Sequence, residues 1–169
     1  MIPPSAWVER HLPRVLPGGR MLDLACGSGR HARLMARCGH PVLAVDRDAG
    51  ALAALAGVSG VTVLAADLEG PEWPLAGERF AGIVVTNYLW RPRLADLCAL
   101  LAPGGMLIYE TFMAGNEAYG KPSNPDFLLR PGELREVVRS AGLREVDFVE
   151  GPVATPKPAM RQAICAVRA

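Results

Sequence analysis

The stretch that decides the fold is Asp23-Leu24-Ala25-Cys26-Gly27-Ser28-Gly29-Arg30, which joins an apolar run to a helix-forming run. Residues 21–25 have the composition of a short buried strand, and residues 30–38 place apolar side chains at helical spacing. Glycines at such a junction let a ligand approach the backbone, and the first turn of the helix offers free N–H groups. The stretch therefore predicts a ligand-binding loop at the edge of a sheet.

Outward from this loop, apolar strands alternate with helices along the chain. Strands are predicted at residues 21–25, 42–45, 61–65, 83–86, 106–110, 145–149 and 163–167. Helices are predicted at residues 5–12, 30–38, 49–56 and 94–101, with a last one opened by Pro131 and closed by Gly142. Residues 69–79 are rich in Pro and Gly and predict a loop. The alternation predicts one α/β domain over residues 1–169, with a mainly parallel sheet that ends in an antiparallel hairpin.

Two further segments carry turn or loop signals. Pro103-Gly104-Gly105 predicts a turn before the fifth strand, since Pro suits the second position of a turn and Gly tolerates a positive φ after it. Residues 111–130 contain Gly, Asn, Pro and aromatic side chains with neither helical nor strand period. A connection of this length without a period is a candidate functional loop, and we expect it to act as a lid over the binding site.

Composition excludes several classes of protein. The 169 residues carry a net charge of +1, which argues against a protein that holds nucleic acid by its charge. The four cysteines form no C-x-x-C pair and no secretory leader is visible, which favours reduced thiols and a cytoplasmic location. The uncharged stretch 49–66 is broken by glycines and predicts no membrane span. The three histidines lie far apart, so no metal site is predicted.

Acidic residues at two strand ends indicate the kind of ligand. Asp46 ends the second predicted strand, 19 residues after Gly27. An acidic side chain at this point can accept hydrogen bonds from both hydroxyls of a nucleotide ribose. Asp67 follows the third strand and adds an acceptor for an amino group on the base. Together these residues predict a ligand that contains adenosine.

Gly27-x-Gly29-x-x-Ala32 also fits the dinucleotide-binding pattern, so a nicotinamide cofactor is an alternative. Asp23, four residues before Gly27, opposes this reading because its carboxylate would repel a pyrophosphate and attract an ammonium or sulfonium group. Arg30 and Arg10 are available to pair with a carboxylate of the ligand. These charges favour a cationic adenosine ligand over NAD.

At these residues the chain resembles the class I S-adenosylmethionine-dependent methyltransferases. Asp23-x-Ala25-x-Gly27-x-Gly29 is similar to that family's first motif, D/E-x-G-x-G-x-G, with Ala25 in place of the first glycine. Asp46 corresponds to its ribose-binding acid and Ala66-Asp67 to its adenine-contacting dipeptide. Pro103-Gly104-Gly105 resembles the turn before its fifth strand. The short length is similar to that of the bacterial tellurite-resistance and thiopurine methyltransferases.

The resemblance implies a fold, a cofactor and a set of binding residues. The fold is a Rossmann-like doubly wound sheet of seven strands in the order 3-2-1-4-5-7-6, with an antiparallel seventh strand and helices on both faces. The cofactor is S-adenosylmethionine. The implied cofactor-binding residues are Asp23, Ala25, Gly27, Gly29, Arg30, Asp46, Arg47, Asp67, Leu68 and Asn87.

On the acceptor side, Asn87-Tyr88-Leu89-Trp90 follows the fourth strand. This stretch lacks the N-P-P-Y/F sequence of amino-group methyltransferases, so methylation of an amine is less favoured. Tyr88 and Trp90 are candidates to line the acceptor pocket, and we expect residues 111–130 to be the lid on this acceptor side. Glu110 is the leading general-base candidate, followed by Tyr88, Tyr109 and His31.

We therefore expect a methyltransferase for a small molecule, with nucleic acid and membranes not expected as partners. The alternatives are a protein that binds the adenosyl ligand without turnover, an RNA methyltransferase and, least favoured, an NAD-dependent dehydrogenase.

Overall fold

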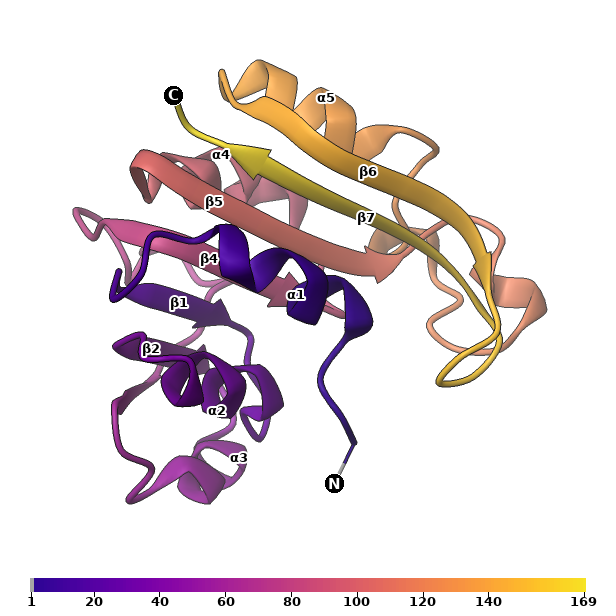
Figure 1. Ribbon diagram of the computed structural model, residues 1–169. Helices are drawn as coiled ribbons and strands as arrows, with labels where there is room; N and C mark the ends of the chain where they lie inside the picture. Colours follow the sequence, from indigo (N-terminus) through magenta and orange to yellow (C-terminus); the bar gives the residue numbers. More distant parts are fainter. Residues whose placement is uncertain (1) are drawn as a thin grey trace.

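Seven strands form one sheet in this computed structural model, which describes residues 2–169 (Figure 1). They are β1 (Met21–Leu24), β2 (Val42–Asp46), β3 (Val61–Ala65), β4 (Phe80–Thr86), β5 (Leu101–Phe112), β6 (Arg144–Val153) and β7 (Ala159–Val167). Their order across the sheet is β3-β2-β1-β4-β5-β7-β6, and β7 runs antiparallel to both of its neighbours. The predicted Rossmann-like order is confirmed.

Helices cover both faces of the sheet, as predicted. On one face lie α1 (Ala6–His11), α2 (Arg30–Arg37) and α3 (Ala49–Leu52), which share one apolar cluster with the strands. On the other face lie α4 (Leu94–Ala99) and α5 (Glu133–Ser140), within a second cluster. Between β3 and β4 the chain forms turns, and Leu68 and Leu75 fill that part of the core without a helix. No helix in residues 2–169 is both long and apolar enough to cross a membrane.

The helix α1 packs against β7, the last strand of the chain, and holds the N-terminal residues in place. The Ser5 hydroxyl accepts hydrogen bonds from the backbone N–H groups of Trp7 and Val8, which makes Ser5 an N-cap. Trp7 is buried, and its indole N–H donates to the Ile164 carbonyl of β7 at 3.1 Å. Ser5 is thereby held next to the carboxyl ends of the central strands.

The Pro103-Gly104-Gly105 segment is not the separate turn that the sequence predicts. It lies inside β5 as an irregular first section, where the partners on β4 change from Phe80 opposite Leu101 to Gly82 opposite Met106. Gly104 has the expected positive φ of 79°, and its N–H donates to the Arg168 carbonyl. These cross-strand bonds keep the segment in the sheet, so β5 is longer than predicted.

Residues 111–130 are also more ordered than their composition predicts. Thr111 and Phe112 complete β5, and Met113 pairs with Leu129 across the base of the segment. The side chain of Asn116 is buried, donates to the Pro122 carbonyl and accepts from the Met160 N–H. Two single turns of 3-10 helix, Asn116–Ala118 and Pro125–Phe127, complete the segment. The segment is therefore anchored at its base and braced from within.

Candidate functional site

A cleft of about 410 Å³ opens where the parallel strands end at the carboxyl edge of the sheet. Ligands of open α/β sheets bind at this edge, next to the point where the strand order reverses. Its lining residues come from the ends of β1, β2, β4 and β5, the turn after β3 and the 111–130 segment. They are Ala25, Asp46, Arg47, Ala66, Asp67, Leu68, Glu69, Asn87, Tyr88, Leu89, Thr111, Phe112, Pro122 and Phe127.

The glycine loop turns through left-handed backbone conformations. Ala25, Gly27 and Gly29 have φ values of 55°, 57° and 84°. Ala25, which stands where the family motif has a glycine, therefore keeps the glycine-like backbone path, at a cost of about 1 to 2 kcal/mol for an L residue. At Gly29 an added Cβ would lie 2.5 Å from the methyl groups of Leu55, so the loop packs too closely for any side chain there.

Asp46 connects this loop to the end of β2. Its Oδ2 accepts the Gly27 N–H at 2.8 Å, and its Oδ1 accepts the Asp48 N–H at 2.9 Å. A carboxylate has further lone pairs, so the side chain can still accept hydroxyl donors from the cleft that it lines.

Asp23 lies beneath the loop and does not line the cleft. Its side chain is only 1% exposed, and its Oδ2 has no hydrogen-bond partner within residues 2–169. Burial raises the pKa of this carboxyl to about 7. A buried carboxyl oxygen without a partner would gain from a nearby cationic donor.

Polar groups at the other end of the cleft surround the position after β3. Asp67 Oδ1 accepts the Glu69 N–H at 2.9 Å, and Glu69 Oε2 accepts the Tyr88 hydroxyl at 3.1 Å. Burial raises the pKa of Tyr88, so the phenol stays protonated and donates. Arg47 and Leu68 complete this end. The sequence analysis did not single out Glu69, which lies two residues after Asp67.

Comparisons with known proteins identify the family. A family model described as "Methyltransferase domain" matches residues 21–105, which span β1 to the start of β5. A ubiquinone biosynthesis O-methyltransferase of Cereibacter sphaeroides is 30% identical, over 85% of this chain and 68% of its own. The chain belongs to the class I S-adenosylmethionine-dependent methyltransferases.

Other relatives agree on the fold. TehB of Haemophilus influenzae superposes with a TM-score of 0.78 at 17% identity, over 96% of this chain but 61% of its own. A Burkholderia thailandensis 1,6-didemethyltoxoflavin-N1-methyltransferase, solved with S-adenosylhomocysteine, gives a TM-score of 0.68 at 24% identity over 96% of this chain and 75% of its own. A tRNA U34 carboxymethyltransferase of Methylococcus capsulatus is 28% identical over 80% of this chain and 48% of its own.

The residues of this methyltransferase fit the cofactor that the family uses. The unpartnered Asp23 oxygen suits an ammonium group, the left-handed loop leaves its backbone open at Gly27, and Asp46 suits ribose hydroxyls. Asp67 and Leu68 offer a polar and an apolar surface for a base. Within residues 2–169, no three His, Cys, Asp or Glu side chains are grouped as metal ligands.

Two of the predicted catalytic residues are occupied elsewhere in the methyltransferase. Glu110 Oε1 accepts from the Ser5 hydroxyl at 2.9 Å and from Arg161 at 3.1 Å, and Glu110 does not line the cleft. His31 is buried, and its Nε2 accepts the Ser5 N–H at 2.9 Å. Burial, reinforced by Arg30, lowers the pKa of His31 to about 4, so the ring is a neutral structural acceptor here.

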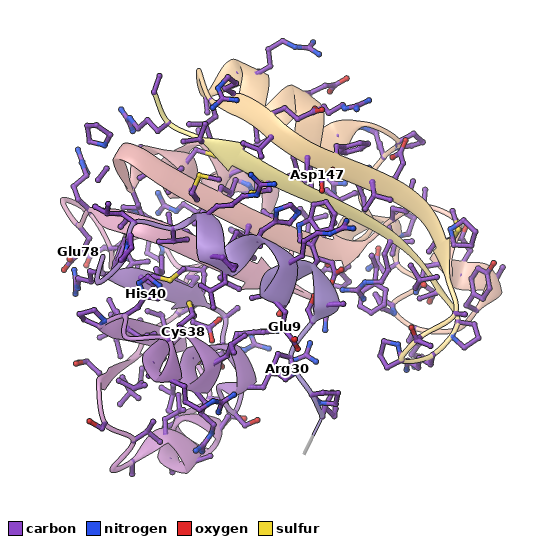
Figure 2. All side chains as sticks on the ribbon, in the orientation of Figure 1. Glu9, Arg30, Cys38, His40, Glu78 and Asp147 are labelled. Carbon is purple, nitrogen blue, oxygen red and sulfur yellow. The ribbon has the colours of Figure 1, made fainter. Side chains whose placement is uncertain are left out.

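Other predicted residues also lie outside the cleft wall. Tyr109 is fully buried and donates to the Tyr88 carbonyl at 2.7 Å, which makes it a support for the end of β4. Trp90 lies beyond the cleft and faces a small internal pocket near α4. Arg10 is 3.7 Å from Asp147 of β6. Figure 2 shows Asp147 well apart from Arg30, which donates to the Pro3 carbonyl at 2.7 Å. Arg10 is therefore not a partner for the ligand's carboxylate.

Sequence reasoning missed Arg161 and Ser5, which meet at Glu110. Arg161 belongs to β7 and lies behind the cleft wall, because β7 pairs directly with β5 and places Arg161 opposite Phe112. Ser5 arrives through the packing of α1 on β7. Neither residue belongs to a local motif, so only the long-range pairing of the sheet reveals them.

Proposed function

We propose that this methyltransferase uses S-adenosylmethionine to methylate a small molecule in the cleft described above. The observation that carries the proposal is the lining of the cleft: the strand ends on one side carry the residues predicted to bind adenosine, and Phe112, Pro122 and Phe127 form an apolar wall elsewhere. An apolar wall beside polar strand ends suits a small acceptor. The relation to an O-methyltransferase supports the same substrate class.

S-adenosylmethionine, when bound, would supply an electrophilic methyl group for transfer to the acceptor. Asp46, Asp67 and the glycine loop would hold its adenosine and fix the position of the reacting end. Asn87 and Tyr88 follow β4 directly and orient the acceptor. Phe112 and Phe127 keep water away.

The side chains of the cleft are better suited to orienting the acceptor than to removing a proton from it. Tyr88 is a protonated donor, and the carboxylate of Glu110 already pairs with Arg161. The Tyr88 hydroxyl donates its proton to Glu69, so we propose that its oxygen accepts a hydrogen bond from the acceptor, and that a proton released from the acceptor passes to water at the mouth of the cleft. An acceptor of low pKa would need no further base.

The test is a turnover assay with methyl-labelled S-adenosylmethionine and a cell extract separated into small molecules and RNA. The proposal expects S-adenosylhomocysteine to form together with label in the small-molecule fraction. Asp46→Ala, which removes a cleft carboxylate, should lose this label, whereas Asp48→Ala, which removes a helix cap outside the cleft, should keep it. Label confined to RNA would establish the alternative that the tRNA-modifying relative suggests. Cofactor binding with no labelled product in either fraction would favour a binding protein.

A further inference from the structure

Arg161 is a largely buried cation next to the acceptor half of the cleft. Its side chain is 13% exposed, and its Nη2 donates to Asn87 Oδ1 at 2.7 Å and to Glu110 Oε1 at 3.1 Å. Its guanidinium carbon lies 4.5 Å from the centroid of the Phe112 ring. Asn87 and Phe112 both line the cleft, so the guanidinium lies directly behind its wall.

The hydrogen bonds of Arg161 leave part of its donor capacity unused. Within residues 2–169, neither Nε nor Nη1 has a partner, and neither is sealed from solvent. An arginine carries five N–H donors in a planar fork, and the fork matches a carboxylate. Arg161 does not itself line the cleft, but its free donors are partly open to solvent next to two residues that do.

Arg161 is a buried cation with one acidic partner, Glu110, which shares its Oε1 with the Ser5 hydroxyl. Burial is the main influence and lowers the pKa of Arg161, Glu110 raises it, and Arg30 lowers it by a smaller amount. His31 is neutral because its pKa is lowered to about 4. An additional anion would favour the charged form of this buried guanidinium.

We propose that Arg161 binds a carboxylate on the methyl acceptor, and that the acceptor is a small aromatic acid. This inference rests on the proposed function. The aromatic part follows from the apolar walls of the compartment, where Phe112, Phe127 and Tyr88 offer ring faces and edges. The anionic part follows from the free donors of Arg161.

The position of Arg161 assigns it to the acceptor and not to the cofactor. Two of its contacts, Glu110 and Phe112, belong to the end of β5, which supplies none of the predicted cofactor-binding residues, and the third, Asn87, is the last of those residues in the chain. Arg30 is the cation on the glycine loop, next to the first residues of the chain (Figure 2). It lies close enough to Arg161 to influence its pKa, so the binding test below also measures the affinity for the cofactor product.

The test measures binding and needs no turnover. The protein, saturated with S-adenosylhomocysteine, is titrated with benzoate and salicylate and with their neutral amides, benzamide and salicylamide, by chemical-shift perturbation. We expect at least one acid to bind tenfold or more tightly than its amide. Arg161→Gln should abolish this preference, and Arg161→Lys, which keeps the charge but loses the fork, should weaken it.

Arg135→Gln is the matched control. Arg135 also pairs with a glutamate, Glu145, at 2.8 Å and also lies over a phenylalanine ring, that of Phe148 at 4.1 Å, but neither of these two residues lines the cleft. It should keep the wild-type preference.

Three results would overturn the inference: no acid preferred in the wild type, a preference that survives in Arg161→Gln, or a loss of S-adenosylhomocysteine affinity in that variant as large as the loss of acid affinity. The wild-type comparison stands even if a variant fails to fold. A wild-type protein that does not bind S-adenosylhomocysteine would instead contradict the proposed function.

Discussion

At the end of β2, the Asp46 carboxylate both lines the cleft and holds the glycine loop through Gly27. Asp46→Ala should therefore weaken S-adenosylhomocysteine binding by about 1.5 to 3 kcal/mol, the range for hydrogen bonds to a charged group. It should also lower the free energy of unfolding, because the loop loses its tie to β2. Isothermal titration calorimetry and urea denaturation measure the two effects separately.

Asp48→Ala separates the loss of stability from the loss of affinity. Asp48 caps α3 by accepting the Ala51 N–H at 3.1 Å and does not line the cleft. Loss of an N-cap costs about 1 kcal/mol of stability, and the affinity should stay within twofold of the wild type. Unchanged affinity in a folded Asp46→Ala protein would remove Asp46 from the site.

The buried Asp23 carboxyl gives the stability a defined pH dependence. Its pKa is about 7 in the folded protein against 3.8 in the unfolded chain. Between these values the folded state holds a proton that the unfolded state has released, so this group's contribution falls as the pH rises toward 7. The Asn side chain of Asp23→Asn does not titrate. The free energy of unfolding of this variant, relative to that of the wild type, should therefore rise by about 2 to 3 kcal/mol from pH 5 to pH 8.

Urea denaturation of both proteins at the two pH values provides the measurement. His31, with a pKa lowered to about 4, acts in the opposite direction, because its contribution is lost as the pH falls below 6.5. His31 is present in both proteins, so its effect cancels in the difference. A difference that does not change with pH would show that Asp23 is not buried as a neutral acid.

A comparison of Gly27 and Gly29 shows how much stability a side chain in the glycine loop costs. Both have positive φ, but an added Cβ meets Leu55 at 2.5 Å at Gly29 and nothing within 4 Å at Gly27. Gly27→Ala should cost about 1 to 2 kcal/mol of stability from backbone strain alone. Gly29→Ala should cost more, because a clash with a packed side chain adds typically 1 to 3 kcal/mol. Equal losses in urea denaturation would contradict the close packing of the loop on α3 and the turn that follows it.

At the scale of elements, the 111–130 segment combines a braced base with an exposed inner face. Phe127 and Tyr119 are each 48% exposed, but only Phe127 lines the cleft. If the segment covers the acceptor, Phe127→Ala should lower turnover or acceptor affinity far more than S-adenosylhomocysteine affinity. Tyr119→Ala should change neither. An equal effect of the two changes, measured by kinetics and calorimetry, would mean that the segment acts only as structure.

The elements whose residues carry a local period were predictable from the sequence. The α2 and α5 helices and the parallel strands β1 to β4 follow from apolar spacing and lie within a few residues of their predicted bounds. The length of β5 and the order within residues 111–130 were not predictable, because both depend on partners distant in sequence, such as Arg168 for Gly104 and Met160 for Asn116. The Gly and Pro content of these segments, taken alone, predicts irregular structure.

At the scale of the whole molecule, the sequence located one half of the site better than the other. The cofactor half is built from residues next to strand ends, and Ala25, Asp46, Arg47, Asp67, Leu68 and Asn87 do line the cleft. Their role toward the cofactor stays a prediction. The acceptor half depends on how β7 and α1 pack against β5, so the sequence did not reveal Arg161 and Ser5, which pair with the general-base candidate Glu110.

We propose that the cleft holds an adenosyl cofactor through acidic residues at the strand ends. This is tested by a thermal and calorimetric titration with S-adenosylhomocysteine, with NADH in parallel. At a ligand concentration a hundredfold above the dissociation constant, S-adenosylhomocysteine should stabilise the wild type by about 2.7 kcal/mol, NADH should have no effect, and Asp46→Ala should bind more weakly. Stabilisation by NADH with none by S-adenosylhomocysteine would contradict the account.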